Sequence, residues 1–360
     1  MMQRLIEGSE AIADAAVAAG CRFFAGYPMT PFTELLEHLA RKLPEVGGTC
    51  INAESELEAV GMAWGAAATG ARSATGSTGQ GLALMQESFS EMTLAGLPLV
   101  IFNMSRGQAD YFQSTRGGGH GDYRHIVLAP MDVPEATELT QLAFHLADRW
   151  RNPVLVYGDY LLAHTYESVE IEPIDYGTLP AKDWAVDGSA GGSGKSRLVS
   201  SLGMSKDPKR SVDPESLWKD VAKRHREIEA TEVRVECGFT EDAELVVVAF
   251  GTAAKFVRYV VRQMREQGVP VGYVRPISLW PFPYSALAEA AERATRVAVF
   301  EINAGQMIDD VRLSVLGRAP VVAIGGISTD ASGFGVGRLL DTEIIRERIE
   351  SALKGQEVPV

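Results

Sequence analysis

Short apolar runs of strand length recur along this chain, and a stretch with helical spacing follows most of them. The run at residues 97–104 is nearly continuous in apolar side chains, which is typical of a strand buried on both faces of a parallel sheet. Similar runs occupy residues 153–157, 245–250 and 297–301. Because strands that alternate with helices build parallel sheets covered on both faces, the pattern predicts an α/β fold with a doubly wound parallel sheet.

The first such domain is predicted over residues 1–165. Ser9 is expected to cap its first helix and Gly20 to end it. The expected helices cover residues 9–19, 32–39, 53–70, 82–95 and 133–150, and the expected strands cover 22–26, 73–81, 97–104 and 153–157.

The middle of the chain has a different composition. Residues 166–239 are predicted to form a linker or crossover, with a flexible glycine-rich stretch at 188–194 and an exposed charged helix at 214–231. The alternation then resumes, so a second, smaller α/β domain is expected over residues 240–345. A C-terminal helix and tail are expected over 346–360.

One motif in the linker imitates a nucleotide site. The tripeptide Gly194-Lys195-Ser196 resembles the end of a phosphate-binding loop. That loop needs a glycine five positions before Gly194, where Ser189 stands, and it needs a buried strand before it. Nucleotide binding is therefore not predicted here.

Charge and cysteine usage exclude other classes. With 47 acidic and 34 basic residues, the net charge of −13 argues against binding to nucleic acid or to an anionic membrane. Cys21, Cys50 and Cys237 lie too far apart to hold an iron–sulfur cluster, and such scattered thiols fit a reducing compartment. With no signal peptide and no membrane-spanning run in sight, a cytoplasmic protein is expected.

Three carboxylates lie at the start of the helix expected over residues 53–70, which is rich in alanine and glycine. Acidic residues favour helix N-termini because they complement the helix dipole, and this alone accounts for Glu54, Glu56 and Glu58. A functional interpretation singles out Glu56, since Ala59 and Ala63 lie near its face and would leave its carboxyl desolvated in a cleft.

Three further segments carry a functional and a plain interpretation. The loop YPMTP at 27–31 follows a strand, where α/β folds bind ligands, but it is also an ordinary proline turn. Arg106 follows the strand at 97–104 and suits a carboxylate, unless it is a surface arginine. The segment GGGHGDYR at 117–124 permits close backbone approach to a ligand or partner, unless it is a mobile loop.

Taken in order, these features resemble the alpha subunit of the 2-oxoacid:ferredoxin oxidoreductases, most of all the 2-oxoisovalerate (branched-chain) type. The resemblance runs from residue 8 to about residue 330. It includes VRPISLWPFP at 274–283 and EINAGQM at 301–307 in the second domain. Joint coverage makes the match specific, although each short motif alone is weak.

The resemblance implies that residues 1–165 are the pyrimidine-binding domain of a thiamine diphosphate enzyme and that the second domain is transketolase C-terminal-like. Glu56 takes the position of the glutamate that hydrogen-bonds the aminopyrimidine ring. Thr30 takes the position near the substrate, and Arg106 the position near its carboxylate. The pyrimidine pocket is expected to include Tyr27, Pro28 and Gln80.

The resemblance also implies the reaction and the partners. Such enzymes decarboxylate a 2-oxoacid oxidatively, transfer the acyl group to coenzyme A and pass electrons through iron–sulfur clusters to ferredoxin. The Mg²⁺ that holds the diphosphate needs Asp and Asn after a GDG-type turn, but tyrosine follows both Asp122 and Asp159. No metal ligand is therefore predicted on this chain. A beta subunit is expected to bind the diphosphate and Mg²⁺, with gamma and ferredoxin-like delta subunits.

Two alternatives stay open. One is 2-oxoglutarate as the substrate, and the other is a non-catalytic assembly or regulatory subunit, because the segment after Arg106 is shorter than in many relatives. An apolar 2-oxoacid is favoured, since the residues expected around the site are largely apolar. The expected wall comprises Met29, Phe32, Tyr111 and Phe112, and the candidates for a second cation are Arg116 and Arg124.

Overall fold

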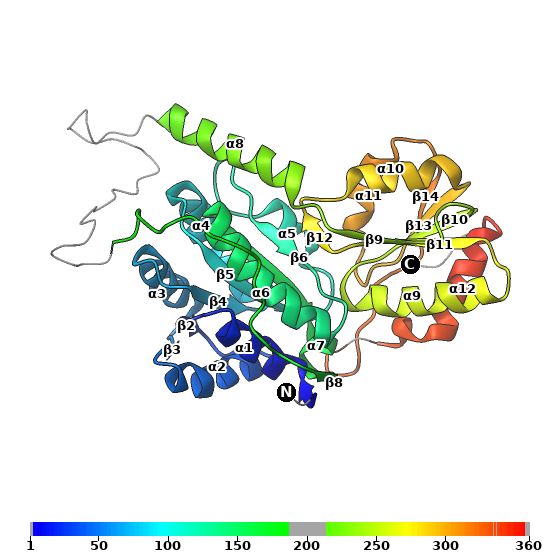
Figure 1. Ribbon diagram of the computed structural model, residues 1–360. Coiled ribbons are helices and arrows are strands. Elements are labelled where there is room, and N and C mark those ends of the chain that lie inside the picture. Colours follow the sequence, from blue (N-terminus) through cyan, green and yellow to red (C-terminus); the bar gives the residue numbers. More distant parts are fainter. Residues whose placement is uncertain (1–2, 187–213, 334, 336, 357–360) are drawn as a thin grey trace.

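Two sheets, each covered by helices, form two units that lie side by side in the computed structural model (Figure 1). We call the elements around the seven-stranded sheet the first unit and those around the five-stranded sheet the second unit. The structure describes residues 3–186, 214–333, 335 and 337–356. The predicted glycine-rich stretch and the Gly194-Lys195-Ser196 motif lie outside the described residues.

The first sheet has the strand order β12-β6-β7-β5-β4-β2-β3, and all its pairs are parallel except β12 with β6. Since β3 and β4 lie on opposite sides of β2, the chain reverses its direction across the sheet between β2 and β4. Such a reversal opens a crevice at the carboxyl ends of the strands. The strands are β2 (Phe23–Gly26), β3 (Thr49–Asn52), β4 (Ser73–Ser77), β5 (Leu99–Ser105), β6 (Ile126–Leu128), β7 (Pro153–Asp159) and β12 (Ser278–Trp280).

Helices pack on this sheet in neighbouring groups, with α1 against α2 and α6, and α3 against α4. A two-stranded antiparallel ribbon, β1 (Arg4–Glu7) with β8 (Tyr166–Val169), joins the start of the chain to the end of the first unit. The helices are α1 (Gly8–Ala18), α2 (Thr33–Glu45), α3 (Glu56–Ala68), α4 (Gly79–Ala95), α5 (Tyr111–Arg116), α6 (Val133–Trp150) and α7 (Tyr160–His164).

The second sheet has the order β14-β13-β10-β11-β9, parallel except for the pair β9 and β11. In Figure 1, α9 and α12 lie on one side of it and α10 and α11 on the other. Its elements are β9 (Val235–Gly238), β10 (Leu245–Val248), α9 (Gly251–Glu266), β11 (Val271–Pro276), α10 (Tyr284–Arg293), β13 (Arg296–Val299), α11 (Met307–Val315), β14 (Val321–Ala323), a 3₁₀ turn at Arg338–Leu340 and α12 (Thr342–Leu353).

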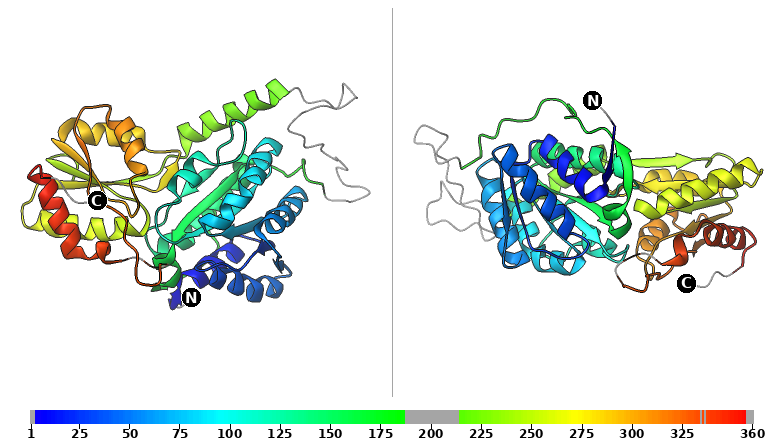
Figure 2. Two further views of the ribbon diagram at one scale, coloured as in Figure 1. Left: turned by 180° about the vertical axis from the view of Figure 1, so that it is seen from behind. Right: turned by 90° about the horizontal axis from the view of Figure 1, so that it is seen from below.

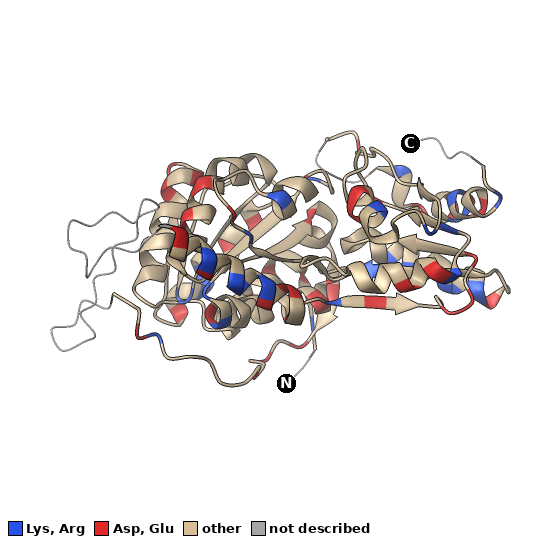
Figure 3. Cartoon of the chain, turned by 90° about the horizontal axis from the view of Figure 1, so that it is seen from above, with Lys and Arg blue, Asp and Glu red and all other residues tan. Residues whose placement is uncertain are grey.

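Helix α8 (Pro214–Thr231) runs along the outside of the first unit, as the two views in Figure 2 also show. It packs closely there, since a Cβ on Gly121 would lie 2.1 Å from the Trp218 ring. On the face seen in Figure 3, acidic and basic residues alternate rather than gather by sign. Within the described residues, no helix combines the length and apolar character needed to cross a membrane.

The α/β class with a doubly wound sheet is confirmed, and several local predictions are corrected. Ser9 does not cap α1, because β1 runs straight into the helix and the Ser9 hydroxyl donates to the carbonyl of Ala163 instead (3.1 Å). Helix α2 continues to Glu45 rather than ending at residue 39. Strand β9 begins before residue 240, while β12 joins the first sheet although it lies within the second predicted domain. The domain limits themselves stay a prediction.

Two histidines are buried where α8 packs on the first unit: His125 just before β6, and His225 on α8 itself. His125 lies edge-on to Phe89, with ring centroids 6.0 Å apart, and burial lowers the pKa of its imidazole to about 4. His225 lies edge-on to Trp280 at 5.5 Å, and burial, together with the charge of Arg224, lowers its pKa to about 3. Both side chains are therefore neutral in the folded protein near pH 7.

We expect the free energy of unfolding to fall as the pH drops from 6.5 toward 4. The unfolded chain takes up protons on these histidines near pH 6.5, whereas the folded chain does not until about pH 4 or below. Each histidine therefore weakens the fold by about 1.4 kcal/mol per pH unit in that window. Urea titrations at pH 7, 6 and 5 measure this, and His125→Phe should have the shallower dependence. Equal slopes in both proteins would contradict the assignment.

Candidate active site

The predicted site residues follow four neighbouring strands of the first sheet. The loop at 27–31 follows β2, Glu56 follows β3, Gln80 follows β4 and Arg106 follows β5. Since these strands are parallel, all four segments emerge at the same edge, on both sides of the reversal between β2 and β4. The topology thus brings together residues that lie far apart in the sequence.

Glu56 is held at the first turn of α3. Ser55 caps the helix by accepting a hydrogen bond from the amide of Leu57 (3.2 Å). The Glu56 side chain turns inward, where the residue is only 4% exposed, and its Oε1 accepts a hydrogen bond from the hydroxyl of Ser77 (3.1 Å). A Cβ on Gly81 would lie 2.2 Å from Oε1, so only glycine at that position leaves room for the carboxyl.

The two neighbouring carboxylates behave differently from Glu56. Glu54 and Glu58 are both exposed to solvent. The hydroxyl of Ser55 donates to Glu58, and this hydrogen bond lowers the pKa of the Glu58 carboxyl. Of the three, Glu56 alone is therefore the buried carboxyl that the helix pattern predicted.

Arg106 and Thr30 lie together. The Nε of Arg106 donates to the backbone carbonyl of Thr30 (3.1 Å), which links the loops after β5 and β2. The hydroxyl of Thr78 lies 2.9 Å from the sulfur of Met29 and 2.9 Å from Oε1 of Gln80, which links the loops after β2 and β4. Loops from three strands thus form one continuous rim.

Tyr27 and Pro28 lie in the same rim and are exposed, Tyr27 to 37%. Both side chains are accessible to a ligand or to another chain. Their predicted contact with a cofactor, and that of Gln80, stay predictions.

Sequence reasoning missed the residues that shape the start of α4. A Cβ on Gly79 would lie 2.1 Å from the Asp110 carboxylate, so α4 and the segment after β5 approach as closely as glycine allows. The Nδ2 of buried Asn103 donates to the same carboxylate (3.4 Å). The glycine pair in Gly79-Gln80-Gly81 was the available signal, since glycine at a helix start marks close approach.

Some predicted wall residues lie elsewhere. Phe32 is fully buried beneath β2 and β4, where it stacks on Phe24 with ring centroids 6.0 Å apart. Tyr111 is fully buried against Phe250 of the second unit. The glycine run after Arg116 approaches α4 rather than a ligand, and the amides of Gly118 and Gly119 donate to Tyr123 (3.0 Å each).

The edge offers a buried, hydrogen-bonding carboxyl at the start of α3. The buried carboxyl of Glu56 accepts a hydrogen bond from the Ser77 hydroxyl on its Oε1. Its other oxygen would suit a hydrogen bond to a ring nitrogen. Among the residues that the structure describes, no three His, Cys, Asp or Glu side chains gather as metal ligands would.

Comparisons with known proteins agree with this geometry. The family described as "Pyruvate flavodoxin/ferredoxin oxidoreductase, thiamine diP-bdg" matches residues 14–187, and "Pyruvate:ferredoxin oxidoreductase core domain II" matches residues 243–332. The ketoisovalerate oxidoreductase subunit VorB of Methanothermobacter thermautotrophicus is 37% identical over 87% of this chain and 90% of its own length. The 2-oxoglutarate synthase subunit KorA of the same organism is 36% identical over 88% and 92%.

Solved structures match the fold. The 2-oxoglutarate:ferredoxin oxidoreductase of Magnetococcus marinus superposes with a TM-score of 0.80 at 22% identity, over 98% of this chain but only 65% of that one. A split-gene transketolase, an inactive beta4 tetramer, superposes with a TM-score of 0.60 at 16% identity, over 98% and 99%. Sequence relatives, the matching families and the fold agree: the chain belongs to the 2-oxoacid:ferredoxin oxidoreductases and is a thiamine-diphosphate-binding subunit of that family.

Proposed function

We propose that this chain holds the aminopyrimidine half of thiamine diphosphate in an enzyme that decarboxylates an apolar 2-oxoacid, such as 2-oxoisovalerate, to an acyl-CoA. The observation that carries the proposal is the buried carboxyl of Glu56 at the strand edge, bonded to Ser77 and given room by Gly81. Electrons pass to ferredoxin through iron–sulfur clusters on partner chains. The three cysteines, none of them in a disulfide, support a cytoplasmic location.

Glu56 acts as an acid–base group toward the cofactor. Thiamine diphosphate, when bound, supplies a nucleophilic carbon and an electron sink. A buried carboxyl beside a ring nitrogen can share a proton with it, whereas an amide can only form a hydrogen bond. Ser77 fixes one oxygen of Glu56 at 3.1 Å and so orients the other for this exchange. Tyr27, Pro28 and Gln80 are the proposed neighbours of the ring.

Arg106 and Thr30 bind the substrate in this proposal. A 2-oxoacid carries its carboxylate beside the reacting carbonyl, and the planar guanidinium of arginine suits that group. The 3.1 Å bond between Arg106 and the Thr30 carbonyl supports a joint role, because it holds the arginine across the rim. The exposed Thr30 side chain then faces solvent at the same place.

Partner chains complete the site. We propose that the exposed face of α3 and α4 is the surface that binds the beta subunit, and that the beta subunit holds the diphosphate and Mg²⁺. A gamma subunit and a ferredoxin-like delta subunit complete the proposed complex. Three large apolar side chains are exposed on this face, and Gly61 and Gly65 of α3 lie open, since a Cβ added to either would meet nothing within 4 Å. Glycine weakens a helix by about 1 kcal/mol, so its use here suits close approach by another chain. The apolar side chains are Leu57, Met62 and Leu84.

An apolar substrate is favoured because both candidates for a second cation are engaged elsewhere. Arg116 forms an ion pair with Asp310 of the second unit (2.9 Å). Arg124 donates to the backbone carbonyl of Arg116 (3.2 Å) and lines a cleft of about 630 Å³ with Trp280. The second carboxylate of 2-oxoglutarate would be unpaired in an apolar pocket, and burying it there weakens binding. This loss of binding free energy is larger than the gain from burying one or two methyl groups.

We expect the assembled enzyme to have a higher kcat/KM for 2-oxoisovalerate than for 2-oxoglutarate. Relatives named for both substrates are about equally similar, at 37% and 36% identity, so the measurement has to be made on the protein itself. Other branched 2-oxoacids should also be accepted, because each methyl group contributes only about 1–3 kcal/mol of discrimination. A preference for 2-oxoglutarate would mean that a cation, from this chain or a partner, reaches the pocket.

A non-catalytic assembly or regulatory role is the other candidate function. The short segment between Arg106 and the start of α5 at Tyr111 motivates it. A chain that had lost turnover would not need glycine at position 81 to make room for the Glu56 carboxyl. This observation favours the catalytic role.

A further inference from the structure

The second unit has the crevice in which α/β sheets bind ligands. Since β11 and β13 lie on opposite sides of β10, the chain reverses direction between β10 and β13. The crevice therefore lies where β10 leads into Phe250 and β13 leads into Ile302 and Asn303. All three residues are at least 95% buried, so another segment of the chain covers this edge of the sheet.

Gln108 of the first unit fills that crevice. Its side-chain Nε2 donates to the carbonyl of Phe250 (2.8 Å), and its Oε1 accepts from the amide of Ile302 (2.9 Å). Its backbone carbonyl accepts from Nδ2 of Asn303 (2.8 Å), and its backbone amide donates to the carbonyl of Ile302 (3.3 Å). Each of its four polar atoms is thus bonded to the second unit, and the residue is only 1% exposed.

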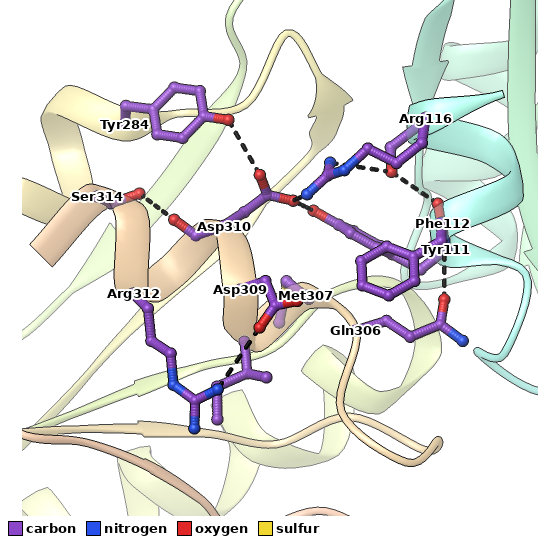
Figure 4. Close-up of polar contacts among 12 residues, drawn as sticks. Tyr111, Phe112, Arg116, Tyr284, Gln306, Met307, Asp309, Asp310, Arg312 and Ser314 are labelled. Atoms are coloured by element: carbon purple, nitrogen blue, oxygen red, sulfur yellow. Dashed lines mark hydrogen bonds and ion pairs between the residues drawn. The ribbon is translucent and has the colours of Figure 1, made fainter.

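Contacts of the same kind continue along α5. The side chain of Gln306 donates to the carbonyl of Ala109 (2.7 Å) and accepts from the amide of Phe112 (2.8 Å). Asp310, which is 2% exposed, accepts hydrogen bonds from Tyr111 (2.6 Å) and Tyr284 (3.0 Å) and pairs with Arg116 (2.9 Å). Figure 4 shows these groups converging on Asp310.

The N-terminus of α11, another common anion site, is saturated from within. The carboxylate of Glu301 accepts hydrogen bonds from the amides of Gln306 (3.1 Å), Met307 (2.8 Å) and Ile308 (3.1 Å). The donors that would otherwise attract an anion are therefore occupied. The usual ligand edge of the second unit is built to receive the segment 108–116 instead.

We propose that the second unit positions Arg106, with Gln108 as the positioning residue and Asp310 as a second anchor. This inference rests on the proposed function, in which Arg106 binds the substrate carboxylate. Only Gly107 separates Arg106 from Gln108, and glycine would leave the arginine free to move if the next residue were not fixed. The bonds from Gln108 to Phe250 and Ile302 remove that freedom.

Two variants and one matched control test the proposal in the assembled enzyme. Gln108→Met keeps the size of the side chain but loses both of its hydrogen bonds, and Asp310→Asn keeps the shape but loses the ion pair with Arg116. Asp309→Asn is the control, because Asp309 is on the same helix turn, is exposed, and pairs with nearby Arg312 at 3.5 Å on its own helix. Thermal melting and gel filtration establish that each variant folds and assembles.

We expect Gln108→Met and Asp310→Asn to raise KM for the 2-oxoacid by about tenfold, the size of one hydrogen bond, with a smaller change in kcat and none in KM for coenzyme A. Hydrogen exchange of the amides at 107–113 should become faster in both variants. Asp309→Asn should change neither quantity.

A double-mutant cycle with Arg106→Ala separates this inference from the function on which it rests. If Gln108 acts through Arg106, Gln108→Met has no further effect on KM in the Arg106→Ala background. Equal effects in both backgrounds would overturn the positioning role while leaving Arg106 as the substrate arginine. If Arg106→Ala itself left KM unchanged, the proposed role of Arg106 would fail, and the exchange data would then report only on docking of the two units.

Discussion

Replacing Glu56 by Gln in the assembled enzyme should lower kcat by roughly 10²–10⁴-fold, the range for loss of one acid–base group. The amide keeps the shape of the side chain and can still accept the hydrogen bond from Ser77, so the fold and the melting temperature should change little. It cannot share a proton with a ring nitrogen. Steady-state kinetics with saturating thiamine diphosphate measure the loss.

Glu54→Gln and Glu58→Gln are the matched controls for this experiment. Both carboxylates lie on the same helix start but are exposed, and Glu58 is engaged by Ser55. Each control should retain most of the wild-type kcat. Similar losses in all three variants would mean that the charge of the helix start, rather than the buried carboxyl, is what catalysis requires.

Purified alone, the chain should turn over no 2-oxoacid even with thiamine diphosphate, Mg²⁺ and an artificial electron acceptor. The motivation is the sequence, in which tyrosine follows both Asp122 and Asp159, so that neither fits the Asp-and-Asn turn that would hold Mg²⁺ and the diphosphate. Activity should appear when the partner subunits are added. Turnover by the homogeneous chain would refute the proposal that this chain holds only the aminopyrimidine half of the cofactor.

Gly61→Trp should have the same effect as leaving out the partner. Gly61 lies on the exposed face of α3 with no neighbour within 4 Å of an added Cβ, so the isolated chain should tolerate the larger side chain. The same side chain should block docking of the beta subunit on this face. Glu347→Trp, an exposed position on α12 in the second unit, introduces the same bulk away from this face. Gel filtration of the mixed subunits should show loss of the complex only for Gly61→Trp.

Local patterns predicted the elements well where the chain's own periodicity determines them. Helix α6 and helix α8 have the predicted bounds, and the strand predicted at 97–104 is the fully buried β5, which begins two residues later and ends at Ser105. The short elements α5 and β6 were not predicted. Helix α5 has only six residues and β6 three, so their structure depends on contacts with other segments rather than on their own pattern.

The sequence by itself determined the α/β class, the family and which of the three carboxyls at the start of α3 is buried, because strand and helix periods are local and Glu56 has small residues on its inner face. Only the tertiary structure decided which side chains meet. Ser9, Phe32 and Tyr111 were assigned from their neighbours in the chain, yet their contacts come from α7, from β4 and from the second unit. The sequence does not predict a role for Gln108, because the carbonyl of Phe250 that it contacts lies 142 positions away. The crevice that it fills forms only when both sheets have folded.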